Sequence, residues 1–188
     1  GALCAETLEV TETGCADNHE WDAVSRAKMP EVIERGEIMY EKVGNILKTA
    51  KESNTAAIAF ICMDYVMART VVYAAEATNT PAIVMLFPEH VTIQHTTGFE
   101  KYAAMVKELA GEVKVPIGLH CDHDYSCEAI MRTIRAGFGS VMMDGSMNDL
   151  DTNIAVTKKV VDAAHETGVF VEGEIGHVGT AADADNDK

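Results

Sequence analysis

Four residues whose side chains commonly bind metals, His120, Cys121, Asp122 and His123, end one apolar run of this 188-residue sequence. Imidazole, thiolate and carboxylate groups are the ligands that zinc takes in proteins. Because alternate side chains of a strand share a face, His120 and Asp122 are expected on one face. Cys121 and His123 are expected on the other face until the strand ends. The spacing therefore predicts that the four do not all bind one ion, and it leaves open a polar strand end with a hydrogen-bonded histidine.

Three acids, Asp144, Glu172 and Glu174, stand at or near the ends of the next two apolar runs. A buried carboxylate needs a cation or several hydrogen-bond donors to offset the loss of its hydration. These acids are therefore candidate metal ligands, and a structural ion pair with lysine or arginine is the competing interpretation. Of the two glutamates, Glu174 lies nearer the C-terminal end of its predicted strand.

The elements that must position these residues are short apolar runs that alternate with helical patterns from Thr55 onward. The runs cover residues 56–61, 82–87, 115–120, 140–144 and 169–175. Continuous apolar runs indicate strands buried on both faces, and alternation with helices indicates parallel pairing through right-handed crossovers. The sequence therefore predicts an α/β fold. Polar residues gather where the runs end, a pattern that favours a barrel over an open sheet.

The composition is typical of a folded, acidic protein, with 47% hydrophobic and 24% charged residues. Fifteen lysines and arginines stand against thirty acids, which gives a formal net charge of -15. Such a surface repels phosphate backbones and anionic lipids, so neither nucleic acid nor a membrane is an expected partner. The sequence has no apolar run long enough to span a bilayer, no signal-peptide pattern and no paired-cysteine motif, so we expect a cytoplasmic protein.

The chain divides into two regions by pattern. Residues 1–38 carry scattered acids and no persistent hydrophobic period, which predicts an acidic N-terminal extension. Residues 39–188 carry the alternating pattern and are the predicted barrel domain. Neither the dinucleotide motif G-x-G-x-x-G nor the phosphate-loop motif G-x-x-x-x-G-K-[ST] occurs, so no nucleotide cofactor is expected.

The segments LHCDHDYS (119–126), AGFGSVMMDGS (136–146) and NIAVTKKVVDAAHETGVFVEGEIG (153–176) resemble the class II, zinc-dependent fructose-bisphosphate and tagatose-bisphosphate aldolases. The similarity runs from about Val43 to about Gly179. It implies a (β/α)8 TIM barrel, of which about the first five βα units are present. It also implies reversible cleavage of a ketose 1,6-bisphosphate into dihydroxyacetone phosphate and an aldehyde.

The resemblance also assigns roles to single residues. Asp122 matches the catalytic aspartate that handles the proton on the aldehyde-side oxygen, and His123 matches a zinc ligand. Asp144 and Glu174 match acids that the family places near the metal, including a position for a second monovalent or divalent cation. In this family Zn²⁺ polarises the ketone oxygen of a phosphorylated ketose. Because family members are commonly oligomeric, a homo-oligomer is expected.

Several departures from the family pattern bear on activity and substrate. A barrel of this kind takes about 250 residues, and this sequence ends just after its fifth predicted strand. The resemblance places two further zinc-binding histidines and the glycine-rich phosphate loops in the part that is absent. The second run ends in MLFPEH, where relatives commonly place a serine. Two alternatives follow: an aldolase for a different phosphorylated ketose, and a non-catalytic barrel subunit or scaffold.

Overall fold

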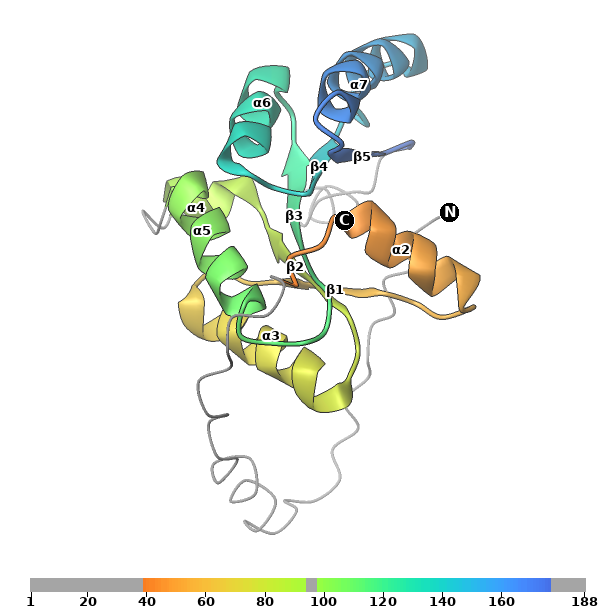
Figure 1. Ribbon diagram of the computed structural model, residues 1–188. Helices are drawn as coiled ribbons and strands as arrows, with labels where there is room; N and C mark the ends of the chain where they lie inside the picture. The colour runs from red at the N-terminus through yellow and green to blue at the C-terminus, as the bar shows by residue number, and fades with distance from the viewer. Residues whose placement is uncertain (1–38, 94–97, 177–188) are drawn as a thin grey trace, which may run out of the picture. The chain divides into compact units, whose positions relative to one another are not determined.

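The computed structural model describes residues 39–93 and 98–176 (Figure 1). The predicted N-terminal extension, residues 1–38, lies outside the described residues. In chain order the elements are α2 (Val43–Glu52), β1 (Ile58–Ile61), α3 (Tyr65–Thr78), β2 (Ala82–Leu86), α4 (Pro88–Ile93), α5 (Phe99–Ala110), β3 (Ile117–Asp124), α6 (Cys127–Ala136), β4 (Ser140–Met143), α7 (Leu150–His165) and β5 (Phe170–Gly173).

The five strands form one parallel sheet in the order β1-β2-β3-β4-β5. Each strand therefore pairs with its neighbour in sequence, and the helices between strands supply the crossovers. This is the strand order of a (β/α)8 barrel. The predicted fold class is confirmed, and the sheet contains the five predicted strands. Within the described ranges, β1 pairs only with β2 and β5 only with β4, so the sheet has two open edges.

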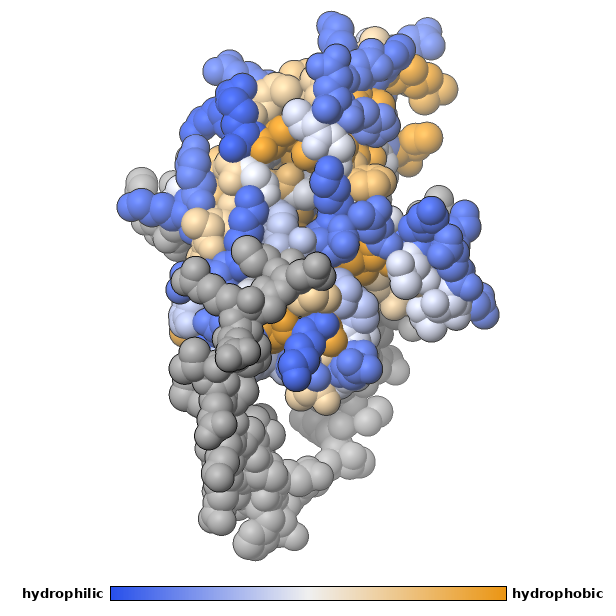
Figure 2. Space-filling model, viewed as in Figure 1, coloured by the Kyte–Doolittle hydropathy of each residue, from blue (hydrophilic) through white to orange (hydrophobic). Residues whose placement is uncertain are grey.

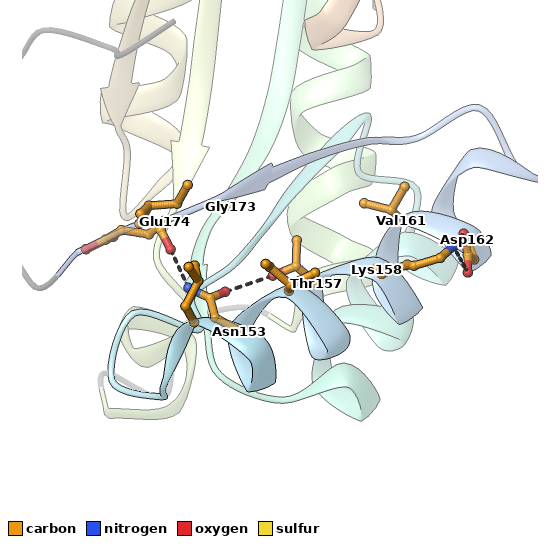
Figure 3. Close-up of a pocket in the computed structure, with 10 residues that line it drawn as sticks. Asn153, Thr157, Lys158, Val161, Asp162, Gly173 and Glu174 are labelled. Atoms are coloured by element: carbon orange, nitrogen blue, oxygen red, sulfur yellow. Dashed lines mark hydrogen bonds and ion pairs between the residues drawn. The ribbon is translucent and has the colours of Figure 1, made fainter.

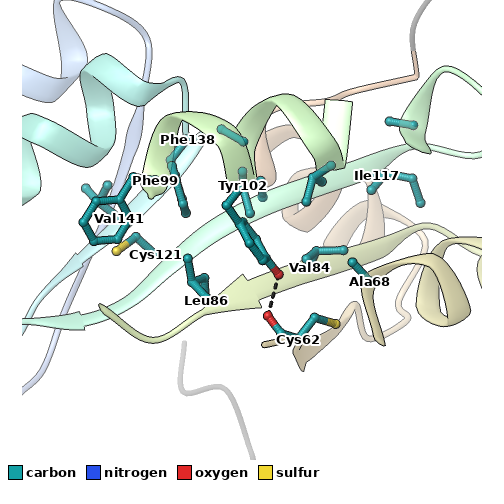
Figure 4. Close-up of a cluster of buried hydrophobic side chains, with 14 of the residues drawn as sticks. Cys62, Ala68, Val84, Leu86, Phe99, Tyr102, Ile117, Cys121, Phe138 and Val141 are labelled. Atoms are coloured by element: carbon teal, nitrogen blue, oxygen red, sulfur yellow. Dashed lines mark hydrogen bonds between the residues drawn. The ribbon is translucent and has the colours of Figure 1, made fainter. Parts of the chain in front are cut away.

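Helices α3, α5, α6 and α7 cover one face of the sheet (Figure 1). Alternate residues of the strands, such as Val84, Leu86 and Leu119, are buried in this layer. Tyr102 and Phe138 are the largest side chains that it buries completely (Figure 4). Apolar burial of this kind is the main favourable contribution to folding, and it fixes the direction in which every strand presents its other side chains.

Helix α2 lies on the opposite face, near the beginnings of the strands. Val43 and Ile46 of this helix pack against Ile83 of β2 in a second, smaller cluster. Gly118 of β3 allows this approach, because a Cβ at that position would lie 2.9 Å from the Val43 Cγ2 atom. Helix α2 therefore occupies the amino-terminal part of this inner face, and the carboxyl-terminal part is left to polar side chains.

Apolar side chains are exposed along both open edges of the sheet. On the β1 edge, Ile58 and Phe60 are 56% and 43% exposed. Beside β5, Leu150, Ile154 and Ile175 are 57%, 57% and 87% exposed, and Figure 2 shows hydrophobic residues at the surface near α7. Parallel sheets are normally covered on both faces, and exposed strand edges are normally shielded or closed into a barrel. None of the helices in the described ranges combines the length and apolar character needed to cross a bilayer.

Tyr102 provides a test of the helix-covered core. Its hydroxyl donates a hydrogen bond to the main-chain carbonyl of Cys62 inside this layer. We expect Tyr102→Phe to lower the free energy of unfolding by about 1–3 kcal/mol, because it leaves a buried carbonyl without a donor. Urea unfolding measures the change. The control is Tyr65→Phe at a half-exposed position, and equal effects of the two substitutions would contradict this packing.

Candidate metal centre

A β-bulge in β3 determines where the metal-binding residue types point. Cys121 pairs with Val141 and Asp124 pairs with Met143, so β3 has two residues where β4 has one. His123, inside the bulge, has a φ of 27°, which residues other than glycine rarely adopt. An extra residue reverses the alternation of side chains. The bulge thus turns His123 toward the inner face.

The strand therefore differs from its sequence-based description in two respects. It extends to Asp124 instead of ending at His120, and its side chains do not alternate strictly. Cys121 lies on the helix-covered face, where it is fully buried in the main apolar cluster. His120 and His123 both lie on the inner face, each close to a carboxylate. The expectation that His123 shares a face with Cys121 is wrong, because the β-bulge between Cys121 and Asp124 shifts the alternation of side chains.

Three strand ends bring His123, Asp144 and Glu174 together on the inner face. The His123 Nδ1 atom lies 3.0 Å from the Asp144 Oδ2 atom and 3.7 Å from the Glu174 Oε2 atom. One potential ligand atom from each residue lies within 4.8 Å of the other two. These are the three residues that the resemblance places near the metal, and their metal-binding role stays a prediction.

The donor set and its spacing fit a metal ion. Zinc accepts one imidazole nitrogen and two carboxylate oxygens, and tetrahedral ligands about 2.1 Å from the metal stand about 3.4 Å apart. The two separations measured from His123 bracket that value. Within the described ranges, no lysine or arginine forms an ion pair with the inner acids. A bound cation would therefore offset the repulsion among these carboxylates.

The loop after β4 and helix α7 hold the two acidic candidates in place. The Ser146 main-chain N–H donates to the Asp144 Oδ1 atom at 3.0 Å. The Asn153 side-chain amide donates to the main-chain carbonyl of Glu174 at 2.7 Å, and Thr157 donates to the Asn153 amide oxygen at 3.1 Å (Figure 3). Neither Ser146 nor Asn153 was expected at the site from the sequence. The one recognisable sequence signal is the serine two positions after Asp144. An aspartate side chain often accepts a hydrogen bond from the main-chain N–H two residues later and so closes a turn.

A groove of about 370 Å³ lies between α7 and the segment that follows β5 (Figure 3). Its lining is mainly apolar and includes Leu150, Ile154, Val161 and Ile175. The ionisable groups discussed above, apart from Glu174, lie outside it. The groove is therefore a feature of the open β5 edge, and the chemistry is concentrated on the inner face.

Asp122 lies beside the three candidate ligands and outside their group. Its Oδ1 atom is 3.9 Å from the His123 Nε2 atom. Burial raises the pKa of the Asp122 carboxyl above its ordinary value, and the nearby His123 offsets part of this rise. A half-buried carboxylate of this kind accepts a proton more readily than an exposed aspartate.

The acids around His123 determine its protonation. Burial alone would lower the pKa of His123, but the hydrogen bond with Asp144 and the charges of Asp122, Asp144 and Glu174 outweigh burial and raise it. At Asp144 burial acts in the opposite direction to its hydrogen bonds, and those with Ser146 and His123 leave its pKa below the ordinary value. Without a metal, His123 and Asp144 therefore favour an ion pair.

Asp64, the polar residue at the end of β1, caps a helix instead of joining this centre. Asp64, after β1, accepts a hydrogen bond from the Met67 N–H and caps α3. Phe87, after β2, packs its ring edge-on against His123, with centroids 6.2 Å apart and an interplanar angle of 87°. The MLFPEH segment departs from the pattern of relatives, and nothing in its sequence predicts this contact.

Parallel βα units define an α/β barrel architecture, and a histidine with acids at the carboxyl ends of the strands is typical of a metal-binding site. Residues 41–188 match the family model described as fructose-bisphosphate aldolase class II. The chain belongs to this family, so the resemblance seen in the sequence is confirmed. Metal dependence is general in class II aldolases, which agrees with the donor set described above.

Individual relatives have similar levels of identity but different names. The chain is 36% identical over 138 residues to the fructose-bisphosphate aldolase of Thermus caldophilus, covering 71% of this chain and 42% of that protein. It is 37% identical over 140 residues to the 6-phospho-5-dehydro-2-deoxy-D-gluconate aldolase of Bacillus subtilis (strain 168), covering 73% and 48%. The structure of the YdjI aldolase from Escherichia coli K12 matches with a TM-score of 0.67 and 31% identity, covering 73% and 52%. The chain thus spans about half the length of these relatives.

The pKa of His123 tests the electrostatics of the centre. In the metal-free chain we expect NMR titration of this imidazole to give a pKa above 6.5. Asp144→Asn should lower it, because the substitution removes the charge that stabilises the imidazolium. Asp149→Asn, at the exposed N-cap of α7, is the control and should leave it unchanged. Because protons compete with metal for the ring nitrogen, zinc affinity should fall as the pH decreases through the pKa of His123. A His123 pKa at or below 6.5 would contradict this arrangement.

Proposed function

We propose that this chain takes part in the reversible, zinc-dependent cleavage of a ketose 1,6-bisphosphate, of the fructose or tagatose type, into dihydroxyacetone phosphate and an aldehyde. The observation that carries the proposal is the convergence of His123, Asp144 and Glu174 on the inner face of a class II aldolase chain, with Asp122 beside them. Family membership supports the type of reaction, and the donor set supports the metal.

Of the zinc ligands, this chain would supply His123, Asp144 and Glu174, the residues whose ligand atoms lie together. When bound, zinc supplies a Lewis acid that polarises the ketone carbonyl of the substrate. The ring contact from Phe87 restricts the orientation of the His123 imidazole. The Ser146 N–H and the Asn153 amide hold Asp144 and Glu174. These contacts preorganise the ligands before the metal arrives.

Asp122 is the proposed proton carrier. In cleavage its carboxylate takes the proton from the hydroxyl group whose oxygen becomes the aldehyde carbonyl, and in condensation it returns that proton. Its raised pKa and partial burial suit this exchange, because they make the carboxylate a stronger base than an exposed aspartate. Its position beside the candidate ligands would place it close to a substrate bound at the metal.

A second candidate substrate is a different phosphorylated ketose. The chain is about equally identical to relatives named for fructose bisphosphate and to relatives named for 6-phospho-5-dehydro-2-deoxy-D-gluconate. Phe87 adds a bulky ring at the end of β2, where relatives commonly have a serine. The test is a panel of fructose 1,6-bisphosphate, tagatose 1,6-bisphosphate and 6-phospho-5-dehydro-2-deoxy-D-gluconate, with the released triose product measured. A zinc-loaded chain that cleaves none of them would favour a non-catalytic barrel subunit.

Two substitutions separate metal binding from proton transfer. We expect His123→Ala to lose bound zinc, because the substitution removes the only nitrogen ligand of the group. Asp122→Ala should retain zinc while turnover falls by about 10²- to 10⁴-fold, because the aspartate moves a proton and does not bind the metal. Metal analysis and turnover are measured on the same samples. Stoichiometric zinc in His123→Ala, or loss of zinc in Asp122→Ala, would contradict the assignments.

A further inference from the structure

Asn153, near the start of α7, is a buried polar side chain that is 7% exposed. Its Nδ2 atom donates to the main-chain carbonyl of Glu174 at 2.7 Å, and its Oδ1 atom accepts a hydrogen bond from the Thr157 hydroxyl at 3.1 Å (Figure 3). A flipped amide would set its oxygen against the Glu174 carbonyl oxygen, because a carbonyl only accepts hydrogen bonds. The two contacts together therefore fix the orientation of the amide.

The same amide packs against Gly145, which lies between Asp144 and Ser146 in the turn after β4. A Cβ atom at position 145 would lie 2.7 Å from the Asn153 Cγ atom, so glycine at this position allows the close approach. The Ser146 N–H donates to the Asp144 Oδ1 atom in this turn. Asn153 therefore touches the turn that orients Asp144 as well as the segment that carries Glu174.

The two carboxylates carried by these segments repel each other. Asp144 and Glu174 belong to the group whose ligand atoms all lie within 4.8 Å of one another. Their side chains are only 7% and 17% exposed. Like charges at such a separation repel more strongly where water is excluded. The segments that carry the two acids therefore need a connection that holds them together, and Asn153 contacts both segments.

We propose that Asn153 is a positioning residue that ties the turn after β4 to the end of β5, and so keeps the Asp144 and Glu174 carboxylates at metal-binding distance. The inference rests on the proposed zinc site and does not depend on how many further ligands the metal takes. Asparagine is a weak helix former, and a buried amide needs partners for its polar atoms. Thr157 supplies one partner and thereby directs the Nδ2 atom at Glu174.

Hydrogen exchange in the metal-free chain tests the connection by itself. The Ser146 N–H closes the Asp144 turn, and we expect Asn153→Ala to speed its exchange about tenfold or more, because the turn loses its support. The Ser126 N–H is the matched control. It donates to the Asp124 Oδ1 atom at 3.1 Å in the corresponding turn after β3 and should keep its rate. An unchanged rate at Ser146, or an equal increase at Ser126, would overturn the proposal.

Zinc affinity, measured by calorimetry, tests the consequence for the site. Asn153→Ala should weaken Zn²⁺ binding by about 10- to 100-fold, the usual effect of losing a residue that orients a metal ligand. Tyr102→Phe, in the helix-covered core, controls for lost stability and should bind zinc within about twofold of wild type. Wild-type affinity in Asn153→Ala would overturn the proposal. A wild-type chain that binds no Zn²⁺ would contradict the zinc site itself, and exchange at Ser146 then decides the role of Asn153.

Thr157 offers a matched pair of variants that keeps the test decisive if Asn153→Ala does not fold. Its methyl group packs against Gly173, where a Cβ atom would lie 3.3 Å from the Thr157 Cγ2 atom. Thr157→Val keeps this packing and removes the hydroxyl, whereas Thr157→Ser keeps the hydroxyl and removes the methyl group. We expect Thr157→Val to speed exchange at Ser146 and weaken zinc binding, and Thr157→Ser to do neither. The same behaviour in both variants would overturn the proposal.

Discussion

Mutual repulsion among the inner carboxylates is the constraint on which this site depends. Asp122, Asp144, Glu172 and Glu174 all face the same side of the sheet, near one half-exposed imidazole. Carboxylates that lose hydration need a cation or hydrogen-bond donors. Main-chain and side-chain donors satisfy Asp144, His120 faces Glu172, and His123 has three acids around it. A cation in this group would satisfy the remaining charge, and the bulge in β3 is what places His123 there.

The α/β fold follows from patterns that are local in sequence. Apolar runs that alternate with helical segments indicate the strand order by themselves, since parallel strands joined by short crossovers are usually neighbours. The resemblance named His123, Asp144 and Glu174 as a group, and the structure brings them together. The face of the sheet toward which their side chains point could not be derived from their spacing in the sequence. Whether β3 has an extra residue depends on its pairing with β4. The sequence LHCDHDYS alone does not reveal the register of that pairing.

The residues whose contacts orient the site look in the sequence like ordinary helix and strand residues, so their type and position do not mark them as functional. Asn153 and Thr157 lie within a helix, Ser140 begins a strand, and Phe87 ends an apolar run. Each reaches the centre only because βα units stack side by side. The same stacking leaves apolar surface at the β1 and β5 edges. Relatives of about twice the matched length carry further chain beyond this region, and a closed barrel would cover these edges.

Anomalous X-ray diffraction at the zinc edge, on crystals of the chain grown with one equivalent of Zn²⁺, tests the central claim most directly. The account predicts one strong peak within about 2.0–2.2 Å of a His123 ring nitrogen and of oxygens from Asp144 and Glu174. A structure with no peak among these residues, or with zinc bound to Cys121 or elsewhere on the chain, would contradict it.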